Sequence, residues 1–273
     1  MREPDSLHEL LTICRDHVVS RSRSNQRELP MSPPASVLEQ PDAQGHATDV
    51  AVEGRSTDID GAMAIISLSR LTTRRWATYK RGSDIILSIV IIAILLIPMG
   101  GIAVLIRCTT NGPVLFRQPR RGKKGRHFNC YKFRTMYHHF SDTMAATQSR
   151  HDDSRVTPLG RWLRKSSFDE LPQILNVLRG DMSLVGPRPH ALGTAINGQL
   201  LPNVIEDYML RYEVQPGITG WAQVNGCRGI LDVEEKLHHR VAHDLYYIAH
   251  WTPLLDIRIL LKTVTCLFGK HVF

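Results

Sequence analysis

The spacing of apolar and polar residues divides the chain into three parts. Residues 1–70 mix Ser, Pro, Arg, Gln and Asp without a sustained apolar period, so we expect a disordered N-terminal extension there. Residues 71–110 hold a long apolar run between basic flanks. Residues 111–273 carry the shorter amphipathic segments that are typical of a folded domain. Within the extension, Leu7, Leu10 and Leu11 indicate no more than a short, transient helix.

The apolar run covers residues 85–108 and holds a single charged residue, Arg107, near its end. A straight helix of this length measures about 36 Å, enough to cross a hydrocarbon core of about 30 Å. Pro98, however, removes a helical hydrogen bond, and the glycines that follow Met99 weaken the next turn. The pattern therefore favours a sharp bend at Pro98. The run lies too far from the N-terminus for a cleavable signal peptide.

Basic flanks on both sides of the run favour a re-entrant helix hairpin. Lys and Arg prefer the cytoplasmic side of a membrane, and a helix that enters and leaves on one face keeps both flanks there. We therefore expect a hairpin broken at Pro98, with a fully spanning helix as the alternative. The flanks comprise Arg74, Arg75, Lys80 and Arg81 before the run, and Arg107, Arg117, Arg120, Arg121, Lys123, Lys124 and Arg126 after it.

The third part predicts an α+β, mostly helical domain. The expected strands cover residues 128–136 and 220–226, and the expected helices cover residues 156–166, 171–179, 204–212, 233–249 and 254–268. Pro253 suits the start of the last helix, whose apolar residues we expect in the core, with the bilayer as the alternative. The basic segment 117–126 is interleaved with apolar Val114, Leu115, Phe116 and Phe128, which predicts contact with lipid headgroups, with a solvated basic loop as the alternative.

Composition narrows the range of partners. The 273 residues carry a formal net charge of +8, which suits anionic partners such as lipid headgroups, pyrophosphates or nucleic acid. No recognisable nucleic-acid-binding module is present, so nucleic acid is not expected as a partner. The five cysteines have no CxxC spacing, which indicates neither a disulfide framework nor a zinc knuckle. We expect a cytosol-facing domain.

Adjacent carboxylates at Asp169 and Glu170 stand where a helix is expected to begin. Backbone amides and the helix dipole favour ionised carboxylates there, as attack on phosphorus or binding of a cation requires. Taken alone, the pair could also be an ordinary helix cap, because Asp is a preferred residue at helix starts. The residues around the pair decide between these interpretations.

Four motifs in the same order resemble those of the bacterial sugar transferases, the monotopic phosphoglycosyl transferases. They are FNCYKFRTM at 128–136, FDELPQ at 168–173, GDMSLVGPRP at 180–189 and PGITGWAQVNG at 216–226. Together they are far more specific than a lone carboxylate pair. The resemblance covers a little over half the chain. It implies a membrane-associated catalytic domain at residues 111–273, preceded by the re-entrant helix.

The resemblance implies transfer of a hexose 1-phosphate from a UDP-sugar, galactose or glucose, to undecaprenyl phosphate. UMP would be released, as the first membrane step of exopolysaccharide synthesis. In the family pattern, Asp169 is the nucleophile that forms a covalent phosphosugar intermediate and Glu170 holds Mg²⁺. The expected location is the cytoplasmic face of the bacterial inner membrane. The other expected partners are the anionic lipids of that membrane and polysaccharide assembly proteins.

Cationic residues are expected to bind the substrate phosphates. Arg164 and Arg188 match family arginines, and a guanidinium suits bidentate phosphate contacts better than Lys does. The wider expected phosphate-binding set is Arg164, Arg188, Lys132, Arg134 and Asp244. Asp244 matches an acidic position of the family, and a surface charge on the helix 233–249 is its alternative.

Other residues either allow two interpretations of their role or depart from the family pattern. Trp221 could stack on a nucleotide base or pack in the interior. His239 and His243 share a helix spacing, but a solvated helix face is expected because no third metal ligand is evident. Cys227 stands where relatives often carry Arg, and Arg228 comes one residue later. Ile97 stands where many relatives have Ser before the proline.

Two other functions compete with phosphosugar transfer. A membrane-anchored scaffold of polysaccharide assembly would not need the intact Asp169–Glu170 pair. A conventional glycosyltransferase that moves the sugar alone would release UDP instead of UMP. The nucleotide product therefore separates the alternatives.

Overall fold

The computed structural model describes residues 69–140 and 153–268. The expected N-terminal extension lies almost wholly outside this part of the chain. A short 3-10 helix, η1 (Arg70–Thr72), leads into α3 (Arg74–Thr109), a continuous α-helix of 36 residues. By length and apolar composition, α3 could cross a membrane. A helix is therefore present where the membrane segment was expected, and it begins about ten residues before the apolar run.

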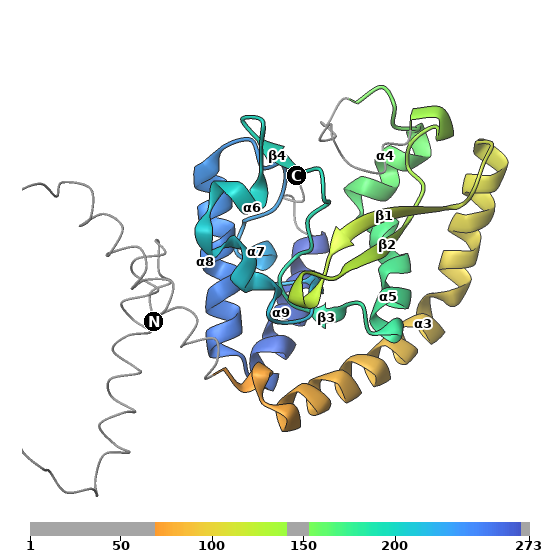
Figure 1. Cartoon of the computed structure of the whole chain (residues 1–273). Coiled ribbons are helices and arrows are strands. Elements are labelled where there is room, and N and C mark those ends of the chain that lie inside the picture. The colour runs from red at the N-terminus through yellow and green to blue at the C-terminus, as the bar shows by residue number, and fades with distance from the viewer. Residues whose placement is uncertain (1–68, 141–152, 269–273) are drawn as a thin grey trace, which may run out of the picture.

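The hairpin expected at Pro98 is not confirmed, because the helix continues through this residue. One lost hydrogen bond can bend a helix without ending it. Figure 1 shows α3 curving around the rest of the domain, beneath it in the first half and along one side in the second. The folded domain lies on the concave side of this curve.

The first half of α3 is fixed to the domain by aromatic and charged side chains. Trp76 packs edge-on against Trp251, with ring centroids 6.0 Å apart. Lys80 is buried, and its Nζ pairs with Asp256 Oδ2 of α9 at 2.7 Å. These contacts hold the first turns of the helix against the C-terminal part of the chain.

The second half of α3 contacts the same domain through apolar side chains. Ile102 and Ile106 are buried in a small cluster with Phe133 and Leu163. Each of these two helical residues is almost fully shielded, and they lie one turn apart, so they present one stripe to the domain. Both halves of the helix thus pack on one body.

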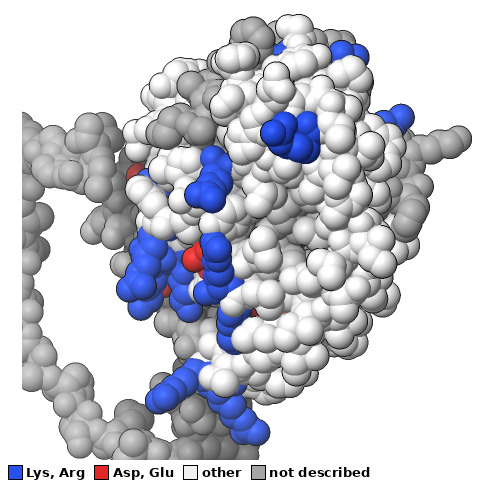
Figure 2. Space-filling model, turned by 90° about the vertical axis from the view of Figure 1, so that its right-hand side faces the viewer, with Lys and Arg blue, Asp and Glu red and all other residues white. Residues whose placement is uncertain are grey.

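The convex side of α3 is apolar and exposed. Figure 2 looks onto the side along which the second half of α3 runs and shows a broad face with few charged side chains, with Lys and Arg gathered toward one margin. Exposed apolar surface of this extent is typical of a membrane contact. The exposed apolar residues are Ile86, Leu87, Ile89, Val90, Ile94, Leu96, Ile97, Val104 and Leu105.

An antiparallel hairpin follows α3. Strands β1 (Leu115–Arg121) and β2 (His127–Phe133) pair from Leu115↔Phe133 to Arg121↔His127, with the turn η2 (Lys123–Gly125) between them. Strand β2 was expected over residues 128–136, but β1 was not expected. Its four charged or amide side chains and Pro119 hide the alternation that signals a strand, which a two-stranded sheet tolerates at its edge.

The remaining elements complete a mixed, mostly helical fold, which agrees with the expected α+β class. Strands β3 and β6 pair in parallel, and β4 and β5 form a short hairpin. The elements are η3 (His138–Phe140), α4 (Pro158–Lys165), η4 (Phe168–Gln173), α5 (Ile174–Arg179), β3 (Ser183–Val185), β4 (Ala195–Ile196), β5 (Gln199–Leu200), α6 (Leu201–Val204), η5 (Glu206–Tyr212), β6 (Gly217–Thr219), α7 (Trp221–Val224), α8 (Glu234–His250) and α9 (Pro253–Phe268).

Three of the expected helices are confirmed with shifts of one or two residues at their ends, namely α4, α8 and α9. The segment 171–179 is divided into η4 and α5, and the segment 204–212 is almost entirely the 3-10 helix η5. The strand expected over 220–226 is wrong, because residues 221–224 form the short helix α7. The apolar and small residues there fit either element, and only packing decided between them.

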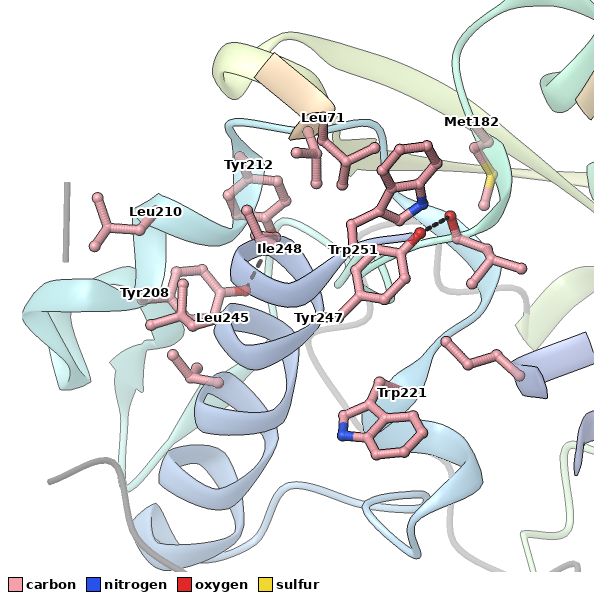
Figure 3. Packing of buried hydrophobic residues seen from close by; sticks show 14 of the residues in the cluster. Leu71, Met182, Tyr208, Leu210, Tyr212, Trp221, Leu245, Tyr247, Ile248 and Trp251 are labelled. Atoms are coloured by element: carbon pink, nitrogen blue, oxygen red, sulfur yellow. Dashed lines mark hydrogen bonds between the residues drawn. The ribbon is translucent and has the colours of Figure 1, made fainter. Parts of the chain in front are cut away.

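The core surrounds α8. Leu237, Val241, Leu245 and Ile248 recur at helical spacing and are buried together with Tyr208, Tyr247 and Trp251. Figure 3 shows the aromatic rings gathered along the side chains of α8, with Trp221 packed below. Val177 of α5 and Leu184 and Val185 of β3 belong to the same cluster, so the core extends from α8 to α5 and β3.

Helix α9 meets the expectation of core packing only in part. Ile259 is fully buried, and Leu255 and Leu260 pack against the core. The opposite side is exposed: Leu254, Ile257, Leu261 and Val264 point outward at spacings of three and four residues. The helix thus has a second apolar stripe that the core does not cover.

Candidate active site

The two adjacent carboxylates lie in the first turn of η4, where β2 packs against this short helix. Ser167 has a left-handed backbone with a φ of 57°, which reverses the chain between α4 and η4. Asp169 is buried, and Glu170 is half-buried. The expected position at a helix start is confirmed, although the helix is of the 3-10 type.

Glu170 is held between two cations. Lys132 Nζ donates to Glu170 Oε1 at 2.7 Å, and Arg188 Nη1 donates to Glu170 Oε2 at 2.9 Å. Arg188 Nη2 also donates to Oε1, so the guanidinium binds the carboxylate in a bidentate manner. Burial alone would raise the pKa of Glu170, but Arg188 and Lys132 outweigh it and hold this pKa well below its ordinary value.

Asp169 has a weaker cationic environment than its neighbour. Lys132 Nζ lies 3.7 Å from Asp169 Oδ2, which is 1.0 Å longer than its distance of 2.7 Å to Glu170 Oε1. Burial raises the pKa of Asp169 above its ordinary value, and Lys132 offsets this in part. The expectation that the helix terminus favours the ionised form is therefore incomplete, because burial acts more strongly here. The carboxylate stays free of a bidentate partner among the described residues.

Arg164 lies close to the pair without bonding to it directly in the described contacts. Its Nε donates to Thr135 Oγ1 at 2.8 Å, and its positive charge acts on the carboxylate of Asp169. Arg164 comes from α4, which starts at Pro158 after Thr157 accepts a hydrogen bond from the backbone of Gly160. The structure thus brings Lys132, Arg164 and Arg188 around the two carboxylates.

The loop that carries Arg188 is fixed by its backbone. Gly186 N donates to Thr219 O at 2.9 Å, and Gly217 N donates to Pro187 O at 2.9 Å, so the loop continues the pairing of β3 with β6. A Cβ on Gly186 would lie 2.5 Å from Gln215 O, which explains the glycine at this point. The close approach of these two segments aims Arg188 at Glu170.

Arg211 is a functional candidate that sequence reasoning missed. Its Nη2 donates to the carbonyl oxygen of Arg188 at 2.9 Å and also pairs with Asp244 Oδ2. Both side chains of this ion pair are almost completely buried. Asp244 holds the pKa of Arg211 above its ordinary value, although burial alone would lower it. Nothing in the sequence near Arg211 marked it, because the partner lies 33 residues away.

Asp244 and Arg134 lie apart from the carboxylate pair in the contacts that the structure describes. Asp244 was expected on the substrate phosphates, but its observed partner is Arg211, and a carboxylate by itself repels phosphate. Arg134 is buried, and its Nη2 donates to Thr110 O and Thr110 Oγ1 at 3.0 and 2.7 Å. Their roles toward a substrate remain predictions.

The remaining residues whose role the sequence did not decide contact other groups of the protein. Trp221 is buried and stacks on Tyr246 with ring centroids 5.8 Å apart, which supports the packing interpretation over base stacking. His239 is exposed on α8 and pairs with Glu235 at 3.9 Å. Arg228 is half-buried, and its Nε donates to Gln223 O at 2.9 Å. Burial lowers the pKa of Arg228, and the charges of Arg188 and Glu170 reach it as well.

A metal at this site would have to use the carboxylate pair. Within the described residues, no three His, Cys, Asp or Glu side chains lie together as a metal cluster. Magnesium often binds through only one or two carboxylates and takes its other ligands from substrate phosphates and water. Asp169 and Glu170 are oxygen ligands of this kind, so the residues fit a magnesium ion that a phosphate substrate completes.

Comparison with known proteins places the site in a family context. The sequence profile described as bacterial sugar transferase matches residues 75–270. The chain is similar to undecaprenyl-phosphate glucose phosphotransferase of Komagataeibacter xylinus, with 46% identity over 215 residues, 78% of this chain and 40% of that protein. It is also similar to UDP-glucose:undecaprenyl-phosphate glucose-1-phosphate transferase of Escherichia coli K12, with 45% identity over 185 residues, 68% of this chain and 39% of that protein.

A third relative is of similar length to the matched part. Exopolysaccharide production protein PSS of Rhizobium leguminosarum bv. phaseoli is 41% identical over 185 residues, 68% of this chain and 92% of that protein. The chain therefore spans about two fifths of the first two relatives and most of the third. The matched region contains every residue of the candidate site.

Proposed function

The chain belongs to the bacterial sugar transferase family, and on that premise we propose that it transfers glucose 1-phosphate from UDP-glucose to undecaprenyl phosphate. The observation that carries this proposal is the pair of adjacent carboxylates, Asp169 buried and Glu170 half-buried, with unequal partners. Glu170 is neutralised by Arg188 and Lys132, whereas the only ion pair of Asp169 among the described residues is the longer contact with Lys132. The relatives named as glucose-1-phosphate transferases support the choice of sugar.

In the first step, Asp169 acts as the nucleophile. A carboxylate oxygen of Asp169 attacks the phosphorus that carries the glucose, the bond from this phosphorus to the UMP oxygen breaks, and UMP leaves with the electron pair. The product is a glucosyl phosphate joined to Asp169 as an acyl phosphate. Arg188 and Lys132 are close enough to exchange Glu170 for the phosphate oxygens, and their charge stabilises the transition state.

In the second step, an oxygen of undecaprenyl phosphate attacks the same phosphorus. The bond to Asp169 breaks, and the carboxylate is regenerated as undecaprenyl diphosphate glucose forms. Because both displacements take place at the phosphorus bonded to Asp169, the Asp169 carboxylate must be accessible to the substrate. Glu170 has no such requirement and can be held by cations. The same product could not arise from a transferase that moves only the sugar and releases UDP.

A magnesium ion fits this chemistry as a partner of the diphosphate. Glu170, with Asp169 beside it, would hold the ion, and the ion would neutralise charge on the substrate's phosphate oxygens. Glu170 must then give up at least part of its contact with Arg188 and Lys132. These two cations would be free to bind the phosphates in the same event.

The placement of α3 supports a re-entrant membrane segment. A helix of 36 residues is about 54 Å long, so its two ends could not both contact one domain on the same side of a bilayer if it crossed straight through. In this fold, Trp76 and Ile106 both pack on the domain, and the apolar residues between them are exposed on the convex side. Because both basic flanks of α3 then lie on the side of the domain, we propose that the domain lies on the cytoplasmic face of the inner membrane.

The decisive experiment measures the nucleotide product. The full chain, reconstituted in vesicles with undecaprenyl phosphate, is expected to convert UDP-glucose to UMP in a reaction that requires magnesium and lipid. Without lipid, radiolabelled glucose should remain covalently attached to the protein in an amount no greater than one per chain. Asp169→Asn should abolish both signals, because the amide cannot form the acyl phosphate.

Asp232→Asn is the matched control. Asp232 is an exposed carboxylate that pairs with Lys236, and no described contact joins it to the carboxylate pair or its cations, so this variant should keep full activity. Release of UDP would support sugar-only transfer. Absence of product with several UDP-sugars, in a protein that folds and inserts, would support a scaffold in polysaccharide assembly.

A further inference from the structure

A cavity of about 630 Å³ lies where the chain leaves α3 and enters the β1–β2 hairpin. Figure 1 shows the C-terminal end of α3 leading directly into β1 at this place. One part of its lining is apolar and another part is basic. The apolar lining residues are Val114, Leu115 and Phe116, and the basic ones are Arg117, Arg134 and His138.

Arg134 is the unusual member of this lining. Only 4% of its surface is exposed, and its Nε and Nη1 have no hydrogen-bond partner among the described residues. Its remaining nitrogen, Nη2, donates to Thr110, and no carboxylate pairs with it in the described part of the chain. A buried guanidinium with two unsatisfied donors is unfavourable by itself and would be stabilised by a bound anion.

The charge around Arg134 supports the same conclusion. Burial lowers the pKa of Arg134, and the nearby positive charge of Arg107 lowers it further. An anion in the cavity would offset both effects. A phosphate group suits this task well, because its oxygens can accept the two free donors of a planar guanidinium.

The position of the cavity indicates which phosphate it would take. The apolar helix α3 ends at Thr109, so the cavity opens near the level at which the chain emerges from the membrane. The apolar side of the lining suits a hydrocarbon chain, while Arg134 suits the charge at the end of that chain. A water-soluble nucleotide would have no use for the apolar side.

The cavity also borders the carboxylate site. Phe116 lies directly opposite Lys132 in the hairpin, and Arg134 follows Lys132 by two residues, about 7 Å along the chain. Thr135, the next residue, accepts the hydrogen bond from Arg164, whose charge acts on Asp169. A phosphate bound at Arg134 therefore lies next to the residues that surround the nucleophile.

We propose that this cavity binds the phosphate and the first isoprene units of the polyprenyl phosphate acceptor, with Arg134 as the phosphate ligand and the 114–116 segment as the apolar wall. This inference rests on the proposed function, which names the acceptor but not its site. It separates Arg134 from the donor site, to which Lys132, Arg164 and Arg188 belong.

The test separates the two half-reactions in the full-length protein in vesicles. Arg134→Met should keep the lipid-independent labelling of the protein by UDP-[¹⁴C]glucose and raise the KM for undecaprenyl phosphate at least tenfold. Val114→Phe, which fills the cavity and leaves the guanidinium in place, should raise the same KM. The matched control is Lys236→Met, since Lys236 is an exposed cation on α8 that pairs with Asp232 and its loss should leave both half-reactions unchanged.

Two soluble probes and one lipid distinguish the sources of phosphate. Farnesyl phosphate should compete with undecaprenyl phosphate in the wild-type protein and lose this effect in Arg134→Met, whereas inorganic phosphate should compete far more weakly. If phosphatidylglycerol competes as well as farnesyl phosphate does, the cavity is a general site for anionic lipids and the proposal is overturned.

Three further results would count against the cavity proposal or against the proposed function. An unchanged lipid KM in both folded cavity variants would overturn the proposal, and so would an equal loss of both half-reactions in Val114→Phe. If the wild-type protein shows no lipid-dependent UMP release at all, the proposed function fails first, and farnesyl phosphate binding by Arg134 then still reports on the cavity itself.

Discussion

Two neighbouring carboxylates differ at the site because their partners differ. Glu170 accepts hydrogen bonds from Lys132 and from both terminal nitrogens of Arg188, while Asp169 is buried with one longer contact. Charge-assisted bidentate pairs are among the stronger interactions in proteins. At the scale of single residues, the roles proposed for the two acids thus rest on which of them the cations contact.

Arg211 is expected to position Arg188, since it holds the carbonyl oxygen of that residue. Arg211→Lys keeps a charge opposite Asp244 but loses the second donor. A hydrogen bond that involves a charged group is worth about 1.5–3 kcal/mol, so its loss corresponds to roughly a 10- to 150-fold decrease in kcat/KM. We expect the KM for UDP-glucose to rise, which steady-state kinetics would detect.

The control for Arg211→Lys is Ile248→Val. Ile248 is fully buried in the core around α8, and its side chain has no described contact with Arg211 or Arg188. This variant should lower the melting temperature and leave the KM for UDP-glucose unchanged. A rise in KM in both variants would mean that Arg211 acts only through general stability.

His190 should make stability depend on pH. Burial lowers the pKa of His190 well below its ordinary 6.5, and neighbouring arginines lower it further. The groups that face the imidazole are Arg211, Arg240, Arg120, Arg188 and the hydroxyl of Tyr208. The folded state therefore keeps the ring neutral while the unfolded state takes up a proton below pH 6.5.

The protein should therefore become less stable as the pH falls. As the pH falls from 7.5 to 5.5, the unfolded state binds the additional proton, and the free energy of unfolding should decrease by about 1.4 kcal/mol from this group. His190→Gln should remove that part of the slope in denaturant titrations at the two pH values. An unchanged slope in the variant would show that other groups cause the pH dependence.

At the scale of elements, the parallel pair β3–β6 fixes the loop that carries Arg188. Gly186→Ala would place a Cβ 2.5 Å from Gln215 O and 3.0 Å from Gly217 N, and neither backbone atom can move without breaking the pairing. We expect strong destabilisation and loss of UMP release, measured by thermal unfolding and by product formation.

Gly82→Ala is the matched control for the same substitution. Gly82 lies in α3, and a Cβ there meets nothing within 4 Å. Alanine in a helix interior is more favourable than glycine by about 0.5–1 kcal/mol, so this variant should be as stable as the wild type or more stable. Equal effects of the two substitutions would contradict the close approach at Gly186.

At the scale of the whole molecule, the curved helix α3 predicts the membrane topology. If the segment is re-entrant, tags at the N-terminus and the C-terminus both lie in the cytoplasm. Protease added to intact spheroplasts should therefore remove neither tag, whereas protease added to inverted vesicles should remove both. Removal of a single tag in spheroplasts would show that α3 crosses the bilayer.

Local patterns were sufficient for much of this protein. The continuous apolar periods of α4, α8 and α9 predicted those helices. The motifs at residues 128–136, 168–173 and 180–189 were enough to single out Lys132, Asp169, Glu170 and Arg188. These features could be found because each depends on residues that are close in the sequence. A helical period and a short motif do not need a distant partner.

Only the tertiary structure decided features that depend on distant partners. The strand β1 exists because β2 supplies its hydrogen bonds, and α7 replaced the expected strand because the core packs around Trp221. Arg211 became part of the site through Asp244, and α3 continues through Pro98 with both of its halves packed on the domain. In each case, the sequence by itself determined which residues were available, and long-range packing and burial decided which of them meet.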